Sequence, residues 1–169
     1  LENWQELKFI EFISELKKAI KETGQTSLTK KDEFDWIELF EENKTNEVWL
    51  KRAADRLEAK ECDGDPLFSK ISEALYKLNP SADAAYKLGV VELQRKNTTK
   101  VLEYFNQAAN MFTDNSKKAF VYYRIATMYS KSNKSQSRAY ARKALAVKPS
   151  YGKAYLLIAI AAKEEEHLE

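Results

Sequence analysis

The chain has 169 residues, of which 44% are apolar and 32% are charged, and its 28 basic and 26 acidic side chains leave a formal net charge of +2. One domain with a continuous apolar core is the default at this length, and the apolar fraction is too high and the net charge too low for a disordered chain. No apolar run approaches the roughly 18 residues that span a bilayer, and the first residues lack a signal-peptide pattern, so no membrane insertion is expected in this segment.

The first part of the chain predicts helices separated by polar loops. Gly and Pro are scarce, and apolar residues recur at the spacing of a helix rather than that of a strand. A first helix carries an apolar stripe over residues 4–20 and ends near Gly24, which can adopt the left-handed C-cap conformation. Asp32 is expected to cap a short second helix, and a further helix is expected to begin near Glu47.

Beyond residue 46, turn-forming residues interrupt the apolar pattern at regular intervals. The breaks fall at residues 63–66, 79–81, 96–98, 114–116, 132–133 and 149–150. They divide the chain into helices of roughly 13 to 17 residues that are joined by short turns.

Small residues recur with the period of a repeat. The first set consists of Ala53, Gly89, Ala126 and Ala159. The second set consists of Ala74, Ala108 and Ala144, which lie in the expected helices that follow those of Ala53, Gly89 and Ala126. Small residues at these places let two helices approach closely, and Pro80 and Pro149 end two of the second helices.

A helix pair of about 34 residues with these features resembles the tetratricopeptide repeat (TPR). The resemblance is best where Leu88 and Gly89 occupy the Leu-Gly positions of the pattern. The implied segments are an N-terminal helical cap or flanking region at 1–45, a degenerate pair at 46–81 whose second helix is one residue out of register, repeats at 82–115 and 116–151, and the first helix of a truncated repeat plus a tail at 152–169. The implied fold is all-α, a right-handed superhelical stack of antiparallel helix pairs, that is, a TPR-like α-solenoid.

The last expected helix is apolar on all sides over residues 154–162, and such a helix must be covered on more than one side. We therefore expect the chain to be part of a longer solenoid, with the exposed side covered by a second copy, as a homodimer, or by the N-terminal helix. The arrangement also resembles the middle of longer bacterial TPR proteins. Because longer relatives of that kind are often exported, the resemblance leaves both the cytoplasm and the bacterial periplasm or envelope open.

Catalytic chemistry is not expected. The chain has one cysteine, Cys62, and one histidine, His167, so the usual nucleophile, general-base and metal-ligand groupings are missing. The Asp63-Gly64-Asp65 turn lacks the later Glu of a calcium loop. We predict no enzyme activity, no catalytic residue, no metal and no cofactor.

The resemblance implies a ligand site on the concave face that the first helices of the repeats form. The candidate peptide-groove residues on this face are Tyr86, Val90, Phe120, Tyr123, Thr127, Lys153, Leu156 and Ile160, and the same helix positions also place Asp83, Leu93, Gln94, Ser130, Lys131 and Lys163 on it. This aromatic and apolar lining with a few cations suits an extended or helical peptide with apolar anchors. A carboxylate clamp is not expected, because Tyr86, Val90 and Arg124 stand where it has Lys and Asn. Alternatively, these side chains pack between neighbouring helices or are covered by residues 1–45.

Charge is distributed unevenly along the chain. Residues 1–65 carry a net −6, residues 66–114 a net +1 and residues 115–169 a net +7. The candidate basic patch consists of Lys134, Arg138, Arg142 and Lys143, of which the first three share a helix face. It could hold an acidic protein, a nucleic acid or an anionic surface, or form a solvated convex face. Nucleic acid is not the expected partner, because no recognised nucleic-acid module accompanies the patch.

Two functions follow from these patterns. The first is a non-catalytic TPR protein–protein interaction module that binds a protein or peptide segment in its concave groove. The alternative is a structural or assembly segment of a longer solenoid, which self-associates through the basic C-terminal repeats and the apolar last helix.

Overall fold

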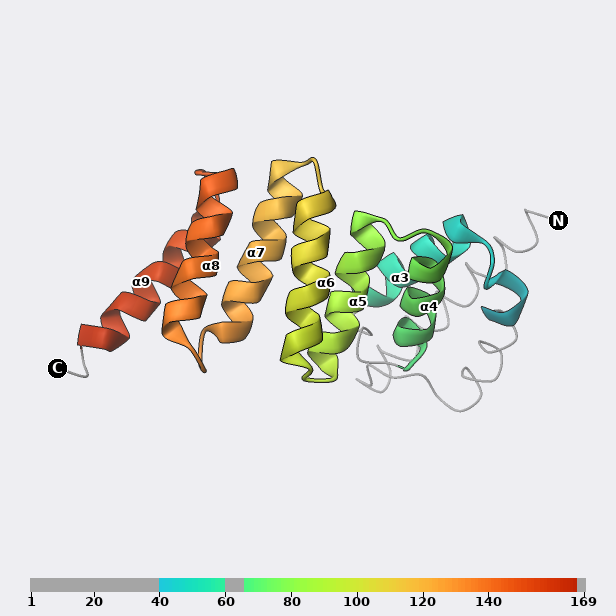
Figure 1. Ribbon diagram of the computed structural model, residues 1–169, viewed down its shortest axis with the longest axis horizontal. Helices are drawn as coiled ribbons and strands as arrows, with labels where there is room; N and C mark the ends of the chain where they lie inside the picture. The colour runs from blue at the N-terminus through green and yellow to red at the C-terminus, as the bar shows by residue number, and fades with distance from the viewer. Residues whose placement is uncertain (1–39, 60–65, 167–169) are drawn as a thin grey trace, which may run out of the picture. The chain divides into compact units, whose positions relative to one another are not determined.

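The computed structural model describes residues 40–59 and 66–166, and the chain divides into two units with the boundary after Asn79. All regular secondary structure in these residues is helical, with no strand among them, which confirms the expected all-α class (Figure 1). The expected helix over 4–20, the Asp32 cap, and the residues Cys62 and His167 lie outside the described residues.

In the described part of the first unit, residues 40–43 are helical, and α3 (Glu47–Ala59) packs against α4 (Pro66–Leu78). Asn46 caps α3, because its Oδ1 accepts a hydrogen bond from the Trp49 backbone N–H at 3.1 Å. The buried faces of the two helices comprise Trp49, Leu50, Ala53, Ala54 and Leu57 of α3 and Leu67, Phe68, Ile71, Ser72 and Leu75 of α4. Ala74 of α4 is half-buried, whereas Leu75 beside it is buried.

The second unit contains α5 (Ala82–Gln94), α6 (Thr98–Met111), α7 (Asn115–Tyr129), α8 (Lys134–Val147) and α9 (Gly152–Glu166), and the turns between them match the breaks that the sequence predicts. A polar residue directly before each of four helices accepts a hydrogen bond from the backbone N–H three residues later. These N-caps are Ser81 (3.2 Å), Asn97 (3.4 Å), Asp114 (3.0 Å) and Asn133 (3.0 Å). Each helix packs against the next one in the chain, and α7 also contacts α9 (Figure 1).

Small residues bring successive helices of this unit together. A Cβ atom on Gly89 of α5 would lie 2.1 Å from Cδ1 of Phe105 on α6, so this crossing requires glycine. Between α7 and α8, Ala126, Ala141 and Ala144 are fully buried, and the buried Ser137 Oγ donates a hydrogen bond to the Ala126 carbonyl at 2.8 Å.

The last helix, α9, is covered on one side only. Ala154 and Ala161 are buried on that side, whereas Tyr155, Leu156 and Ile160 are 55%, 62% and 42% exposed. Ala159 lies on the exposed side, so the close helix contact that the sequence predicts there is absent from the described residues. Despite this apolar surface, none of the described helices is long and apolar enough to cross a membrane.

Candidate functional site

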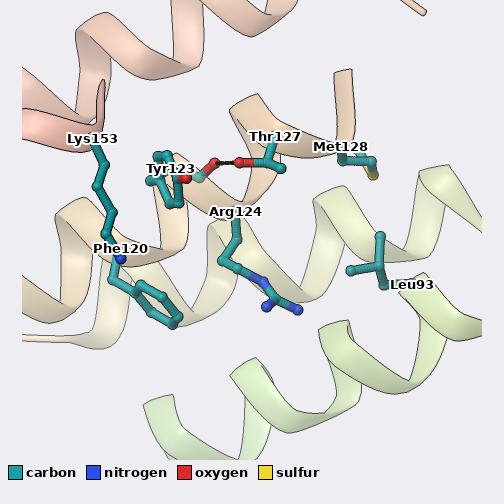
Figure 2. Close-up of a pocket in the computed structure, with 7 residues that line it drawn as sticks. All are labelled: Leu93, Phe120, Tyr123, Arg124, Thr127, Met128 and Lys153. Carbon is teal, nitrogen blue, oxygen red and sulfur yellow. Dashed lines mark hydrogen bonds between the residues drawn. The ribbon is translucent and has the colours of Figure 1, made fainter. Parts of the chain in front are cut away.

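An open pocket of about 470 Å³ lies across three helices of the second unit. Its lining residues come from α5, α7 and α9 and are Leu93, Phe120, Tyr123, Arg124, Thr127, Met128 and Lys153 (Figure 2). Neither α6 nor α8 contributes to it. The pocket is therefore formed by alternate helices of the chain.

The helical period places the five α7 residues on one side of that helix. Phe120, Tyr123, Arg124, Thr127 and Met128 are spaced by three, four, seven and eight residues from the first. The opposite side of α7 is anchored by buried residues, which include Val121, Ile125 and Ala126. Because that side is fixed in the core, the pocket side of α7 is held in place.

A hydrogen bond and two aromatic contacts fix the middle of the pocket. Thr127 Oγ1 donates to the Tyr123 carbonyl at 2.9 Å (Figure 2). The Tyr123 ring packs edge-on against the Tyr151 ring with 5.7 Å between centroids, and Lys153 Nζ lies 6.0 Å from the Tyr123 centroid. Burial raises the pKa of the Tyr151 phenol above 10.0, and the neighbouring Tyr123 raises it further. Tyr123 thus connects α7 with the start of α9.

The pocket carries positive charge and no acidic lining residue. Arg124 is half-buried, and Lys153 is exposed. Within the described part of the chain, neither side chain forms an ion pair. Arg124 extends from α7 towards the side where Leu93 lies, whereas Lys153 extends from α9 towards Phe120 (Figure 2). The two cationic side chains therefore extend in different directions in this view.

Four of the eight predicted groove residues line this pocket: Phe120, Tyr123, Thr127 and Lys153. Leu156 and Ile160 are exposed on α9 but do not line it.

Tyr86 and Val90 require a correction. Val90 has no exposed surface, and Tyr86 is only 9% exposed, because α5 is buried continuously from Ala84 to Glu92. The Tyr86 ring stacks on Phe105 at a centroid distance of 5.5 Å and contacts Phe120 at 5.8 Å. Tyr86 therefore packs against α6 and α7, and neither Tyr86 nor Val90 lines the pocket.

Arg124 and Met128 are pocket residues that the sequence-based list omitted. The sequence pattern identifies Arg124 only as a mismatch to a carboxylate clamp. Both follow a predicted groove residue by one position, since Arg124 follows Tyr123 and Met128 follows Thr127. A helical projection of α7 could have included them, because adjacent residues can line the two edges of a broad face.

The basic patch lies on α8 and is separate from the pocket. Lys134 Nζ donates to the Ser130 carbonyl at the end of α7 at 2.5 Å. Lys143 Nζ lies 4.8 Å from the Tyr140 ring centroid, while Arg142 is exposed and Arg138 is half-buried. Lys134, Arg138 and Lys143 thus have contacts of their own, and the patch is not one uniformly solvated face.

No group of three or more His, Cys, Asp or Glu residues that could hold a metal ion occurs among the described side chains. The aromatic, apolar and cationic lining of the pocket is suited to binding.

The comparisons with known proteins concern the other end of the chain. A model of a family described as a domain of unknown function, DUF8810, matches residues 1–63. No curated protein and no solved structure matches the chain. The matched residues end before the pocket begins.

Proposed function

We propose that this chain is a non-catalytic, TPR-like protein–protein interaction module that binds a protein or peptide segment in the pocket of α5, α7 and α9. In this proposal, the helix pairs form a right-handed solenoid, and these three helices are the first helices of successive repeats. Two side-chain contacts support that arrangement. Lys117 of α7 lies 4.0 Å from Asp83 of α5, and Tyr123 of α7 contacts Tyr151 at the start of α9.

The observation that carries the proposal is the composition of the pocket. Five of its lining residues, Leu93, Phe120, Tyr123, Thr127 and Lys153, stand at positions that the TPR resemblance implies for the concave face. Phe120 is 37% exposed although it is a large aromatic residue. Exposed aromatic side chains beside a pocket are typical anchors for a protein partner.

The test uses random peptides displayed on phage and selected on the intact protein. The selected peptides are then measured against a variant that combines Phe120→Ala and Tyr123→Ala. We expect affinity to fall on the order of a hundredfold or more, because each truncated anchor costs about 2 kcal/mol. The matched control is Tyr155→Ala, which removes an exposed aromatic ring outside the pocket and should leave binding unchanged. Circular dichroism checks that each variant folds, and equal binding to the double variant would refute the proposal.

A second candidate function, self-association, is favoured by the exposed side of α9. Tyr155, Leu156 and Ile160 form an apolar surface there. Lys153 stands in the first turn of α9 and residues 164–166, all Glu, in the last, so both ends carry the charge that the helix dipole disfavours. An antiparallel pair of α9 helices from two copies would bring each basic start near an acidic end.

Sedimentation of the wild-type chain and of a Leu156→Glu/Ile160→Glu variant tests this second candidate. We expect the wild type to associate with increasing concentration and the variant to remain monomeric, while a monomeric wild type would exclude self-association. If the basic repeats contribute, association should weaken sharply with salt and require Arg138 and Arg142. Peptide binding should not change in the α9 variant, because neither substituted residue lines the pocket.

A further inference from the structure

We infer that the pocket selects a protein segment in which an apolar anchor residue is flanked on both sides by carboxylates. This inference rests on the proposed function and specifies its ligand. It depends on the two cations of the pocket, on the lack of acidic side chains among its lining residues and on its aromatic and apolar lining.

The first step concerns Arg124. Arg124 is half-buried as a residue, lines the pocket beside apolar residues and has no hydrogen bond or ion pair to another described side chain. A cation that lies against apolar groups without a compensating anion is in an unfavourable environment. A ligand carboxylate would supply that anion, and the planar guanidinium can bind it through two parallel hydrogen bonds.

The second step concerns the acids of the same unit. Between residues 80 and 163 there are four, Asp83, Glu92, Glu103 and Asp114. Asp83 lies 4.0 Å from Lys117, Glu92 pairs with Arg95 at 3.0 Å, and Asp114 caps α7. None of the four lines the pocket. The positive potential at Arg124 and Lys153 is therefore not cancelled by an acidic group within the pocket lining, and it favours an acidic ligand.

The third step concerns the positions of the cations. Lys153 extends towards Phe120, and Arg124 extends towards the side of Leu93 (Figure 2). Aromatic and aliphatic side chains, including Tyr123, line the same pocket as these two cations. A ligand that uses all of this surface needs an apolar side chain and a carboxylate for each cation. A single carboxylate at the end of a peptide would leave one cation without a partner.

The occupant we favour is therefore an acidic protein segment and not a nucleic acid. Carboxylates fit both cations, and an aromatic or long aliphatic side chain fits the lining. A base could stack on Tyr123, but the cations of the pocket do not form the continuous groove that tracks a nucleic-acid backbone. Competition by an oligonucleotide can distinguish the two ligands.

The experiment compares the peptides that the display selection yields. Peptides whose binding is lost with Phe120→Ala/Tyr123→Ala should be enriched in Asp or Glu on both sides of an aromatic or large aliphatic residue. Replacing these acids with Asn or Gln in synthetic copies should weaken binding on the order of tenfold per acid. Pocket-dependent peptides that are neutral or basic would overturn this inference and leave the proposed function intact. If no peptide depends on the pocket, both proposals fail.

Charge reversal provides the second measurement. We expect the Arg124→Glu/Lys153→Glu variant to lose the acidic peptides and, in a fresh selection, to favour basic ones. The matched control, Lys100→Glu/Lys163→Glu, makes the same change in net charge at exposed positions outside the pocket and should keep the acidic preference. Loss of preference in both variants would show that overall charge selects the peptides, which would overturn the inference. Displacement of the acidic peptides by a single-stranded oligonucleotide at low concentration would also overturn it.

Discussion

Gly89 of α5 and Phe105 of α6 are so close that a Cβ atom on the glycine would lie 2.1 Å from one ring carbon and 2.3 Å from another. The ring cannot move aside easily, because Phe105 is fully buried and stacks on Tyr86. Gly89→Ala gains about 1 kcal/mol of helix propensity, but overpacking of a core costs about 1–3 kcal/mol, and this clash belongs at the upper end. We expect a net loss of about 2 kcal/mol in the free energy of unfolding, measured by urea denaturation.

Gly152 provides the matched control for that substitution. Apart from Gly152 itself, its two chain neighbours and the nearby backbone of its own helix, no atom lies within 4 Å of a Cβ built on this residue, which begins α9. Gly152→Ala should therefore leave stability unchanged or raise it slightly. Combining Gly89→Ala with Phe105→Leu should recover part of the loss, because the smaller side chain gives the new methyl group room. Equal effects of the two glycine substitutions would contradict this explanation.

The helices of the second unit could be predicted because their signals are local. Asn97, Asp114 and Asn133 mark breaks in the sequence, and each accepts the hydrogen bond of an N-cap in the structure. The burial of Val90 could not be predicted in the same way, because it depends on which sides of α5 the surrounding structure covers. The exposure of Ala159 has a similar cause, since the sequence pattern does not state what covers α9.

The pocket was predicted in part for a related reason. The helical period places Phe120, Tyr123 and Thr127 on one face, and this follows from spacing alone. How wide a face of α7 is accessible depends on the distance between α7 and the neighbouring helices. The spacing of residues within α7 gives no information on that distance. Arg124 and Met128 lie within that width and were therefore missed.

The Ser137 hydroxyl lies where α7 and α8 approach closely and donates a hydrogen bond to the Ala126 carbonyl. We therefore expect a larger side chain at Ser137 to destabilise the packing of α7 against α8. Ser137→Ala removes one buried hydrogen bond of 2.8 Å and should cost about 1 kcal/mol in unfolding free energy. Ser137→Leu should cost about 3 kcal/mol, because the larger side chain has to separate two helices that approach through small residues. Ser135→Leu, an exposed substitution on the same helix, should change stability by no more than about 0.5 kcal/mol. A similar loss for both leucine variants would contradict this account.

The N-cap of α7 predicts a pH dependence of stability. The Lys117 backbone N–H donates to the Asp114 carboxylate and lowers its pKa from the ordinary value of 3.8. Because the folded-state pKa is the lower one, this contribution to stability is present above pH 3.8 and is lost as the pH falls through the folded-state value. We expect Asp114→Asn, which keeps an oxygen acceptor, to lose less stability than the wild type on acidification.

Thermal unfolding across the acidic range measures that difference. Asp114→Ala serves as the second variant, since it removes the acceptor and should be less stable than Asp114→Asn at neutral pH as well. Parallel stability curves for the wild type and Asp114→Asn would show that the carboxylate is not linked to folding.

Tyr151, whose ring contacts the pocket residue Tyr123, predicts that stability also falls at alkaline pH. Burial, with a further contribution from Tyr123, raises the pKa of the Tyr151 phenol above 10.0 in the folded chain. The unfolded state therefore releases this proton first as the pH rises, and the stability contribution, fully present below pH 10.0, is lost as the pH rises through the folded-state pKa. We expect Tyr151→Phe to lose less stability than the wild type in this range.

Tyr123→Phe should move the pKa of Tyr151 part of the way back, because it removes the smaller cause and leaves burial unchanged. Difference absorbance spectra of phenolate formation, each variant against the wild type, measure both shifts, and an unchanged Tyr151 titration in Tyr123→Phe would show that the two rings are not electrostatically coupled.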